Sequence, residues 1–180
     1  MVLKSNIALI GFMATGKTTI GNALAEHFAL EFVDTDELIE RKHAKKIANI
    51  FADCGEKFFR EQESICLQTV CHKKFQVIAT GGGVVLREEN IKNLLSGAYV
   101  ICLTATAETI LARTQGKADR PLLQGIDPLA KIKEMMEIRR QYYEKAEYTL
   151  HTDDRELTDI VCEIEVFLQK MGWERPKQHE

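Results

Sequence analysis

The chain has 180 residues, of which 45% are hydrophobic and 28% are charged, a composition that is typical of one soluble globular domain and argues against disorder. Its formal net charge of −3 provides no general basic surface for a nucleic acid, so any site for an anion must be local. The five cysteines lack the paired C-x-x-C spacing of a zinc site, and the apolar stretch near the N-terminus is too short for a membrane span or a signal peptide, so we predict a cytoplasmic protein with no membrane and no nucleic-acid partner.

Short apolar runs alternate along the chain with longer segments of helical period, and together they predict an α/β fold. Strands are predicted at residues 7–10, 31–33, 77–79, 99–103 and 148–151, and helices at 17–28, 36–43, 47–54, 57–72, 88–95, 108–114, 128–146 and 156–171. Such alternation is typical of a parallel sheet with helices on both faces. We expect one domain over residues 1–172, followed by a polar tail at 173–180 that frays.

The first predicted strand and helix are joined by residues 11–18, whose sequence GFMATGKT fits the phosphate-binding pattern G-x-x-x-x-G-K-[ST]. Gly11 and Gly16 allow successive backbone N–H groups to turn toward phosphate oxygens, and the N-terminus of the helix adds positive partial charge. Lys17 is placed to neutralise the β and γ phosphates, and Thr18 is placed to ligate magnesium. The motif therefore predicts a site for a nucleoside triphosphate.

A second group of polar residues begins with Asp34 and Asp36, at the end of the second predicted strand. This edge of an open α/β sheet is where ligands bind. We expect one carboxylate to face a metal ion and the other to face an acceptor hydroxyl. The alternative for Asp36 is a helix N-cap, although capping does not explain the second aspartate.

Three further segments bear on the same edge of the sheet. Residues 55–60, with the sequence GEKFFR, place Arg60 near the start of a helix, where it is either a ligand contact or a solvated surface charge. The triple glycine at 81–83 directly follows the third predicted strand, and close approach of a ligand to the backbone explains it better than a simple turn. Residues 115–127 lack a clear period and carry glycines and cations, so they are either a lid or an ordinary surface connection.

In order and spacing, these features resemble those of the shikimate kinases. The shared motifs are the phosphate-binding loop, the Asp-x-Asp at Asp34 and Asp36, the Gly-Glu-x-x-Phe-Arg at 55–60, the triple glycine, and Arg120-Pro121-Leu122-Leu123 in the candidate lid. The resemblance covers about residues 5–170. Its most specific part is the Gly-Glu-x-x-Phe-Arg motif placed between the Asp-x-Asp and the triple glycine.

This resemblance implies a three-layer P-loop NTPase fold of the nucleoside monophosphate kinase type. The implied sheet has five parallel strands in the order 2-3-1-4-5 with helices on both faces, a substrate-binding segment at about residues 34–62 and a lid at about 114–126. The implied activity is transfer of the γ-phosphoryl of ATP to the 3-hydroxyl of shikimate with the help of Mg²⁺. The products would be ADP and shikimate 3-phosphate, in the pathway to chorismate and the aromatic amino acids.

For the donor half of the site, the resemblance implies that Lys17 and Arg120 are catalytic, and that Mg²⁺ is held by Thr18 directly and by Asp34 through water. The residues implied to bind the nucleotide are Gly11, Ala14, Thr15, Gly16, Lys17, Thr18, Thr19, Arg113 and Arg120, with Arg113 packing on the adenine. Other adenine contacts fall around residues 153–157. Ala14 and Thr15 stand where family members often have Gly-Ala, a departure that spares both glycines and Lys17.

For the acceptor half, Asp36 is the third implied catalytic residue. It would hold the shikimate hydroxyls and either accept the proton of the attacking hydroxyl or mainly orient it. The other residues implied to contact shikimate are Phe51, Phe59, Arg60, Gly81, Gly82, Gly83 and a second arginine in the helix after the lid.

The substrate carboxylate needs a cationic partner, and the parallel N–H groups of an arginine fit its two oxygens. We expect Arg139 to be this second arginine. Its spacing to Tyr143 fits the first part of the family pattern R-x-x-x-Y-x-x-x-A. The alternative alignment through Tyr142 places Ile138 at the arginine position, so Arg140 stays possible.

Three other functions fit part of the pattern. A P-loop kinase acting on gluconate or on a nucleoside monophosphate would also present an anionic substrate to arginines. A catalytically silent relative would have no need to retain Lys17, Asp34, Asp36, Arg60 and Arg120 together. A nucleic-acid-stimulated ATPase is the weakest alternative, since the chain has no basic stripe with interleaved aromatics. We expect the small-molecule partners to be ATP and shikimate. We also expect a monomer, because no exposed heptad or large apolar surface is evident.

Overall fold

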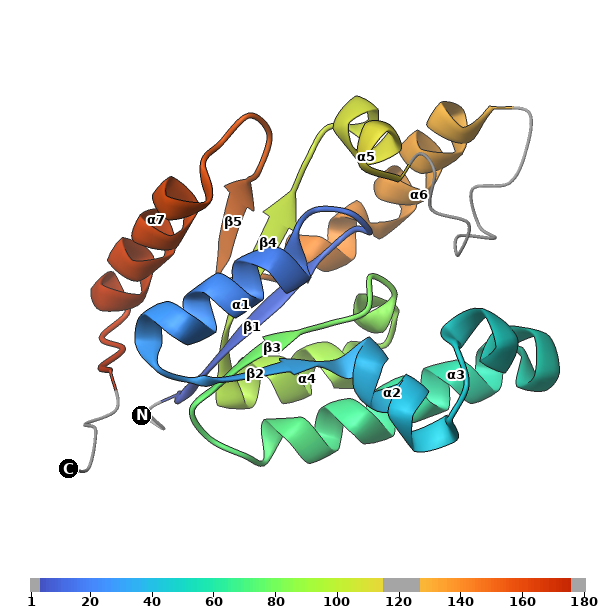
Figure 1. The fold of residues 1–180 in the computed structure, drawn as a ribbon, viewed down its shortest axis with the longest axis horizontal. Helices are drawn as coiled ribbons and strands as arrows, with labels where there is room; N and C mark the ends of the chain where they lie inside the picture. The colour runs from blue at the N-terminus through green and yellow to red at the C-terminus, as the bar shows by residue number, and fades with distance from the viewer. Residues whose placement is uncertain (1–3, 115–126, 176–180) are drawn as a thin grey trace.

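The computed structural model describes residues 4–114 and 127–175. Its centre is a five-stranded sheet in the order β2-β3-β1-β4-β5, in which every neighbouring pair is parallel (Figure 1). The strands are β1 (Asn6–Gly11), β2 (Glu31–Asp34), β3 (Gln76–Ala79), β4 (Ala98–Thr104) and β5 (Tyr148–His151). The predicted fold class and strand order are therefore confirmed.

Helices cover both faces of this sheet (Figure 1). They are α1 (Lys17–Phe28), α2 (Thr35–His43), α3 (Ile47–Cys71), α4 (Glu88–Gly97), α5 (Ala107–Thr114), α6 (Pro128–Tyr143) and α7 (Leu157–Lys170), with a short 3₁₀-helix at Val84–Leu86. None of the helices within the two described stretches is long and apolar enough to cross a lipid bilayer.

The sheet separates two apolar cores because successive side chains of a strand point to opposite faces. Ile7 and Leu9 of β1 pack in one core with α1 and α7, whereas Ala8 and Ile10 pack in the other with α3 and α4. All four side chains are fully buried. Both faces of β1 are therefore covered, which explains why its sequence is a continuous apolar run instead of an alternating one.

The structure differs from the predicted elements in three places. The two helices predicted at 47–54 and 57–72 follow one another directly as α3, and Gly55 (φ 79°, ψ 168°) forms the break between them. Helix α6 ends at Tyr143 and not at residue 146, and the short helix at Val84–Leu86 was not predicted. A Cβ at Gly55 would meet no atom within 4 Å, so the left-handed φ favours glycine there, and crowding plays no part.

The carboxyl ends of the strands meet at one edge of the sheet and position the functional segments. The phosphate-binding loop follows β1, α2 begins directly after β2, and the triple glycine follows β3. Glycine is required at position 11, since a Cβ there would collide with the carbonyl oxygen of Leu103 in the neighbouring strand β4. The fold thus brings segments that are far apart in sequence to one place, as an open parallel sheet is expected to do.

Candidate functional site

A single cleft lies over this edge of the sheet. Its lining comes from the phosphate-binding loop, α2, the first half of α3, the triple glycine, α6 and the segment after β5. Most of the residues predicted for the two halves of the site lie along it. Those among the lining residues are Ala14, Thr15, Gly16, Lys17, Thr18, Thr19, Asp34, Asp36, Phe51, Phe59, Arg60, Gly81, Gly82, Gly83, Arg113 and Arg139.

The phosphate-binding loop is braced by hydrogen bonds to its own carbonyl groups. Lys17 Nζ donates to the carbonyl oxygens of Gly11 (2.9 Å) and Phe12 (2.7 Å), and the buried Thr15 hydroxyl also donates to that of Phe12 (2.9 Å). Gly16, at φ 95°, precedes α1 and offers no side chain to cap the helix. The first N–H groups of α1 therefore face the cleft beside an ammonium group, which is an arrangement suited to phosphate.

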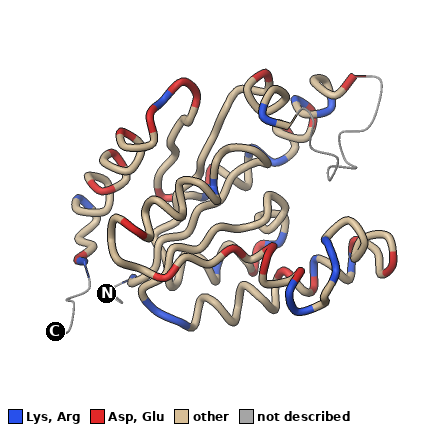
Figure 2. The backbone as a smooth tube through the Cα atoms, viewed as in Figure 1, with Lys and Arg blue, Asp and Glu red and all other residues tan. Residues whose placement is uncertain are grey.

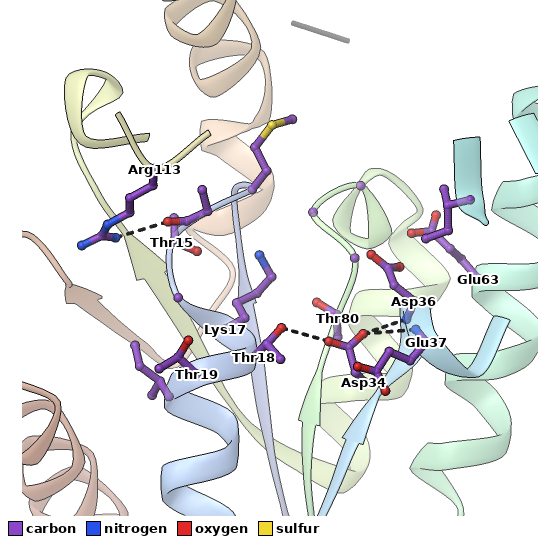
Figure 3. Close-up of a pocket in the computed structure, with 18 of the residues that line it drawn as sticks. Thr15, Lys17, Thr18, Thr19, Asp34, Asp36, Glu37, Glu63, Thr80 and Arg113 are labelled. Carbon is purple, nitrogen blue, oxygen red and sulfur yellow. Dashed lines mark hydrogen bonds between the residues drawn. The ribbon is translucent and has the colours of Figure 1, made fainter. Parts of the chain in front are cut away.

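Arg113 lies at the side of the loop and reaches the segment after β5 (Figure 3). Its guanidinium donates to the carbonyl oxygen of Ala14 (3.2 Å) and to both the hydroxyl (3.2 Å) and the carbonyl oxygen (3.0 Å) of Thr152. Arg155 and Leu157 line the same end of the cleft. Asp153 instead accepts hydrogen bonds from the backbone N–H of Thr106 (3.1 Å), just before α5.

Asp34 joins the phosphate-binding loop to the start of α2. Its Oδ2 accepts a hydrogen bond from the Thr18 hydroxyl (3.0 Å), and its Oδ1 accepts from the backbone N–H groups of Asp36 (3.0 Å) and Glu37 (3.4 Å) (Figure 3). The N-cap of α2 is therefore Asp34, so the alternative in which Asp36 serves only as the cap is wrong. The carboxylate of Asp36 is left to face the cleft.

The Asp36 carboxyl is enclosed and poorly compensated. Its Oδ1 is buried, and it has no hydrogen-bond partner among the described residues. Burial, which is the largest cause, and the nearby carboxylates Glu63 and Asp34 together raise its pKa from 3.8 to about 7, while Lys17 and Arg60 act in the opposite direction. The carboxyl as a whole lines the cleft beside two cations, so a ligand in the cleft can donate a hydrogen bond to it.

We predict that Asp36→Asn stabilises the protein in the absence of ligands. A carboxyl whose pKa is raised on folding does not destabilise the folded protein at a pH below its pKa in the unfolded state. Its destabilising effect grows as the pH rises from about 4 to about 7. A rise in pKa from 3.8 to about 7 destabilises the folded protein by at most about 4 kcal/mol above pH 7. Urea unfolding of the variant and the wild-type protein at pH 5 and pH 8 should show a larger gain in the free energy of unfolding at pH 8. An equal gain at both values, or a loss at pH 8, would contradict this account.

Arg60 is held inside the cleft and is not a solvated surface charge. Its side chain is 14% exposed and pairs with Glu63 (Nη1 to Oε2, 2.5 Å) and with Glu56 (Nη2 to Oε1, 3.1 Å). Its guanidinium carbon lies 5.8 Å from the ring centroid of Phe51 and 5.4 Å from that of Phe59. The aromatic rings and the carboxylates thus fix the fork of donors.

Glu63 was not singled out from the sequence. It is buried, and its Oε1 has no hydrogen-bond partner among the described residues. Burial raises the pKa of this carboxyl, while Arg60, Arg139 and Arg87 oppose the shift. The spacing of three residues from Arg60 was the available signal, but the same spacing is common on solvated helix faces.

The triple glycine is packed against these side chains. A Cβ at Gly81 would lie 2.6 Å from Asp36 Oδ1 and 2.8 Å from Glu63 Oε1, and a Cβ at Gly83 would collide with the guanidinium of Arg60. None of the three glycines has a positive φ. A side chain at position 81 or 83 would therefore require Asp36, Glu63 or Arg60 to move, and the approach of a ligand to the backbone stays a prediction.

Arg139 and Arg140 differ in their surroundings on α6, since Arg139 is buried and Arg140 is exposed. Arg139 is 9% exposed, donates from Nη1 to the carbonyl oxygen of Gly82 (3.2 Å), and lies over the ring of Phe12 with 5.4 Å between its guanidinium carbon and the ring centroid. The side chain of Arg140 is 67% exposed and pairs with Glu137 (3.4 Å) on the helix surface. Of the two, only Arg139 lines the cleft.

Two of the predicted features fall partly or wholly outside the described residues. Arg120 lies there, as does nearly all of the predicted lid. Gly11, by contrast, is described and takes part through its carbonyl oxygen, although it does not itself line the cleft.

The chain is similar to known proteins over most of its length. A family model described as shikimate kinase matches residues 13–169. The chain is 45% identical over 148 residues to the shikimate kinase of Thermodesulfovibrio yellowstonii (82% of this chain, 86% of that protein) and 44% identical over 170 residues to that of Symbiobacterium thermophilum (93% and 98%). The solved structure of the shikimate kinase from Acinetobacter baumannii in complex with shikimate superposes with a TM-score of 0.90 at 36% identity, over 95% of this chain and 96% of that one.

Proposed function

The chain belongs to the shikimate kinase family and is an ATP-dependent kinase, and we propose that its cleft transfers the γ-phosphoryl of ATP to the 3-hydroxyl of shikimate. The products are ADP and shikimate 3-phosphate, in the pathway to chorismate and the aromatic amino acids. The observation that carries this proposal is the position of Asp36. Its carboxyl lines the same cleft as Lys17, Arg60 and Arg139, and one of its oxygens has no hydrogen-bond partner among the described residues.

In the donor half, the backbone of residues 11–16 and the N-terminus of α1 would cradle the phosphates. Lys17, now bonded to carbonyl groups of the loop, would turn to the transferred phosphoryl group and neutralise its charge. Arg113 would pack on the adenine from its place beside the loop. Thr19 would add a contact at the start of α1.

Thr18 and Asp34 are suited to hold Mg²⁺ between the protein and the phosphates. Their oxygens lie 3.0 Å apart at the mouth of the loop, and oxygen atoms are the ligands that Mg²⁺ prefers. No group of three or more acidic, histidine or cysteine residues suited to a metal occurs in the described part of the chain. This agrees with a magnesium ion that one or two protein oxygens bind together with substrate phosphates. The bound ion would neutralise charge on the nucleotide.

In the acceptor half, Arg60 and Arg139 would bind the shikimate carboxylate. The side chain of Arg60 is 14% exposed and Arg139 is buried, and each presents further N–H donors beyond those it uses within the protein. Phe51 and Phe59 would pack near the ring of the substrate, and the glycines of 81–83 would let it approach the backbone. A carboxylate is the group that two such forks recognise best.

Asp36 would receive a hydrogen bond from the attacking hydroxyl. Phosphoryl transfer passes through a loose transition state, so orientation of this hydroxyl and neutralisation of charge contribute more than strong base catalysis. With a pKa of about 7 in the ligand-free protein, the carboxyl can also take up the proton as the new phosphate ester forms. We propose that orientation is its larger contribution.

The remaining proposals concern Arg120, the lid and the setting of the protein. Arg120 would fold over the phosphates as part of a lid at about residues 114–126. We also propose a cytoplasmic monomer with no nucleic-acid partner. The longest basic run, residues 41–46, covers the end of α2 and the turn before α3 (Figure 2). Three of its cations pair with nearby carboxylates, namely Arg41 with Glu37, Lys45 with Asp53 (2.6 Å) and Lys46 with Glu40.

Acceptor specificity tests the proposal directly. ADP production should be fast with shikimate and near the background ATPase rate with gluconate or nucleoside monophosphates, because only shikimate presents a ring carboxylate together with hydroxyls of the right placement. A coupled assay with each acceptor, at equal ATP and Mg²⁺, measures this. Turnover with gluconate or a nucleotide in place of shikimate would assign a different kinase, and no turnover with any acceptor would favour a silent relative.

A further inference from the structure

Tyr143 of α6 contacts the triple glycine of the acceptor half of the site. Its hydroxyl donates a hydrogen bond of 2.8 Å to the carbonyl oxygen of Gly82, in the middle of the triple glycine. Arg139 donates from Nη1 to the same carbonyl oxygen at 3.2 Å. The two side chains are four residues apart on α6, so they project from the same face of the helix.

These two hydrogen bonds use the full acceptor capacity of the Gly82 carbonyl, which has two lone pairs. Gly82 also lies next to the phosphate-binding loop, because a Cβ there would be in van der Waals contact with the carbonyl oxygen of Gly11 (3.4 Å) and with Arg139 Nη1 (3.6 Å). Tyr143 itself is not among the described residues that line the cleft. Any influence of its hydroxyl on a substrate must therefore pass through Gly82 and Arg139.

Neutral groups make the direct contacts of Arg139. They are the Gly82 carbonyl oxygen, the ring of Phe12 and the hydroxyl of Tyr143. The charge of Glu63 also acts on Arg139, but no carboxylate forms an ion pair with it among residues 4–114 and 127–175. This leaves most of its five N–H groups for a ligand, but it also leaves few contacts that hold the fork in place. Burial raises the pKa of Tyr143 to about 12, so the hydroxyl keeps its proton and remains a donor at neutral pH.

Resting on the proposed function, we infer that Tyr143 is a positioning residue for the shikimate carboxylate. Its hydroxyl fixes the Gly82 carbonyl, and this carbonyl in turn holds the guanidinium of Arg139 at the angle that the carboxylate requires. A purely structural role is the competing explanation, because the ring of Tyr143 also packs against the apolar cores beside α6.

The Tyr143→Phe variant separates the two explanations, since it keeps the ring and removes only the hydroxyl. We expect KM for shikimate to rise about five- to tenfold, because the variant loses one buried hydrogen bond. KM for ATP should stay within about twofold of the wild-type value. Tyr142→Phe is the matched control. Tyr142 is half-buried on the same turn, but its ring contacts Lys145 and not the triple glycine. KM does not depend on the fraction of active protein, so a partly destabilised variant remains informative.

A double-mutant cycle then tests whether the effect passes through Arg139. In an Arg139→Lys background, which has no planar fork to orient, adding Tyr143→Phe should change kcat/KM for shikimate by less than twofold. Additive losses would overturn the inference, as would an unchanged KM for shikimate in Tyr143→Phe or an equal rise in KM for both substrates. If the unaltered protein fails to phosphorylate shikimate, the proposed function itself is wrong. If the unaltered protein phosphorylates shikimate and Tyr143→Phe has the same KM for shikimate, only the inference is wrong.

Discussion

Asp36→Asn is expected to lower kcat for phosphoryl transfer to shikimate by a factor of about 10² to 10⁴, the range typical of a positioned acid or base. Asparagine has the same shape, but it cannot accept the proton and presents only one oxygen to the attacking hydroxyl. KM for ATP should change little, because we propose that the loop at residues 11–18 holds the phosphates and that α2 does not. Steady-state kinetics with shikimate as the varied substrate measure the loss.

A suitable control is Asp159→Asn, which removes an exposed carboxylate in the first turn of α7. This variant should retain nearly the full rate. If Asp36→Asn kept more than a tenth of the wild-type kcat, Asp36 would be neither a base nor an essential orienting group. The same variant is expected to be more stable than the wild type at pH 8. A loss of activity at that pH would therefore not be caused by unfolding.

The pair Arg139→Ala and Arg140→Ala is expected to give opposite results. Arg139→Ala should raise KM for shikimate by about 10- to 150-fold, since a charge-assisted hydrogen bond contributes about 1.5–3 kcal/mol. Arg140→Ala should leave KM within about twofold, because its side chain is 67% exposed and its partners are surface glutamates. The two substitutions remove the same side chain from neighbouring positions of one helix, so each controls for the other.

Shikimate titrations by calorimetry or kinetics can follow both variants. A large effect of Arg140→Ala together with a small effect of Arg139→Ala would mean that α6 is turned the other way in the complex. Comparable losses in both variants would point to a general electrostatic contribution and not to a fixed fork.

The fold was predictable because its signals are local. The apolar run of β1 is buried on both faces, and the glycines and lysine of residues 11–18 mark a turn between a strand and a helix. Parallel strands that alternate with helices then allow few arrangements. The junction at Gly55 was predicted as a gap between two helices for the same reason, although the helical turns resume directly after it.

The interior of the acceptor half was harder to predict because it depends on which way side chains turn. The spacing of Glu63 from Arg60 and of Tyr143 from Arg139 is common on any helix, and only packing shows that these partners are enclosed. The three glycines were assigned to a ligand, whereas Gly81 and Gly83 leave room for Asp36, Glu63 and Arg60. Sequence indicated which side chains meet at the cleft, but not which of them support the others.

A crystal structure of the protein with ADP, Mg²⁺ and shikimate tests most directly whether donor and acceptor meet in this one cleft. We predict that the nucleotide phosphates lie along residues 11–18, that the shikimate carboxylate contacts Arg60 and Arg139, and that the 3-hydroxyl lies within hydrogen-bonding distance of Asp36. Shikimate bound with its carboxylate away from both arginines, or with its 3-hydroxyl turned from Asp36, would contradict the account.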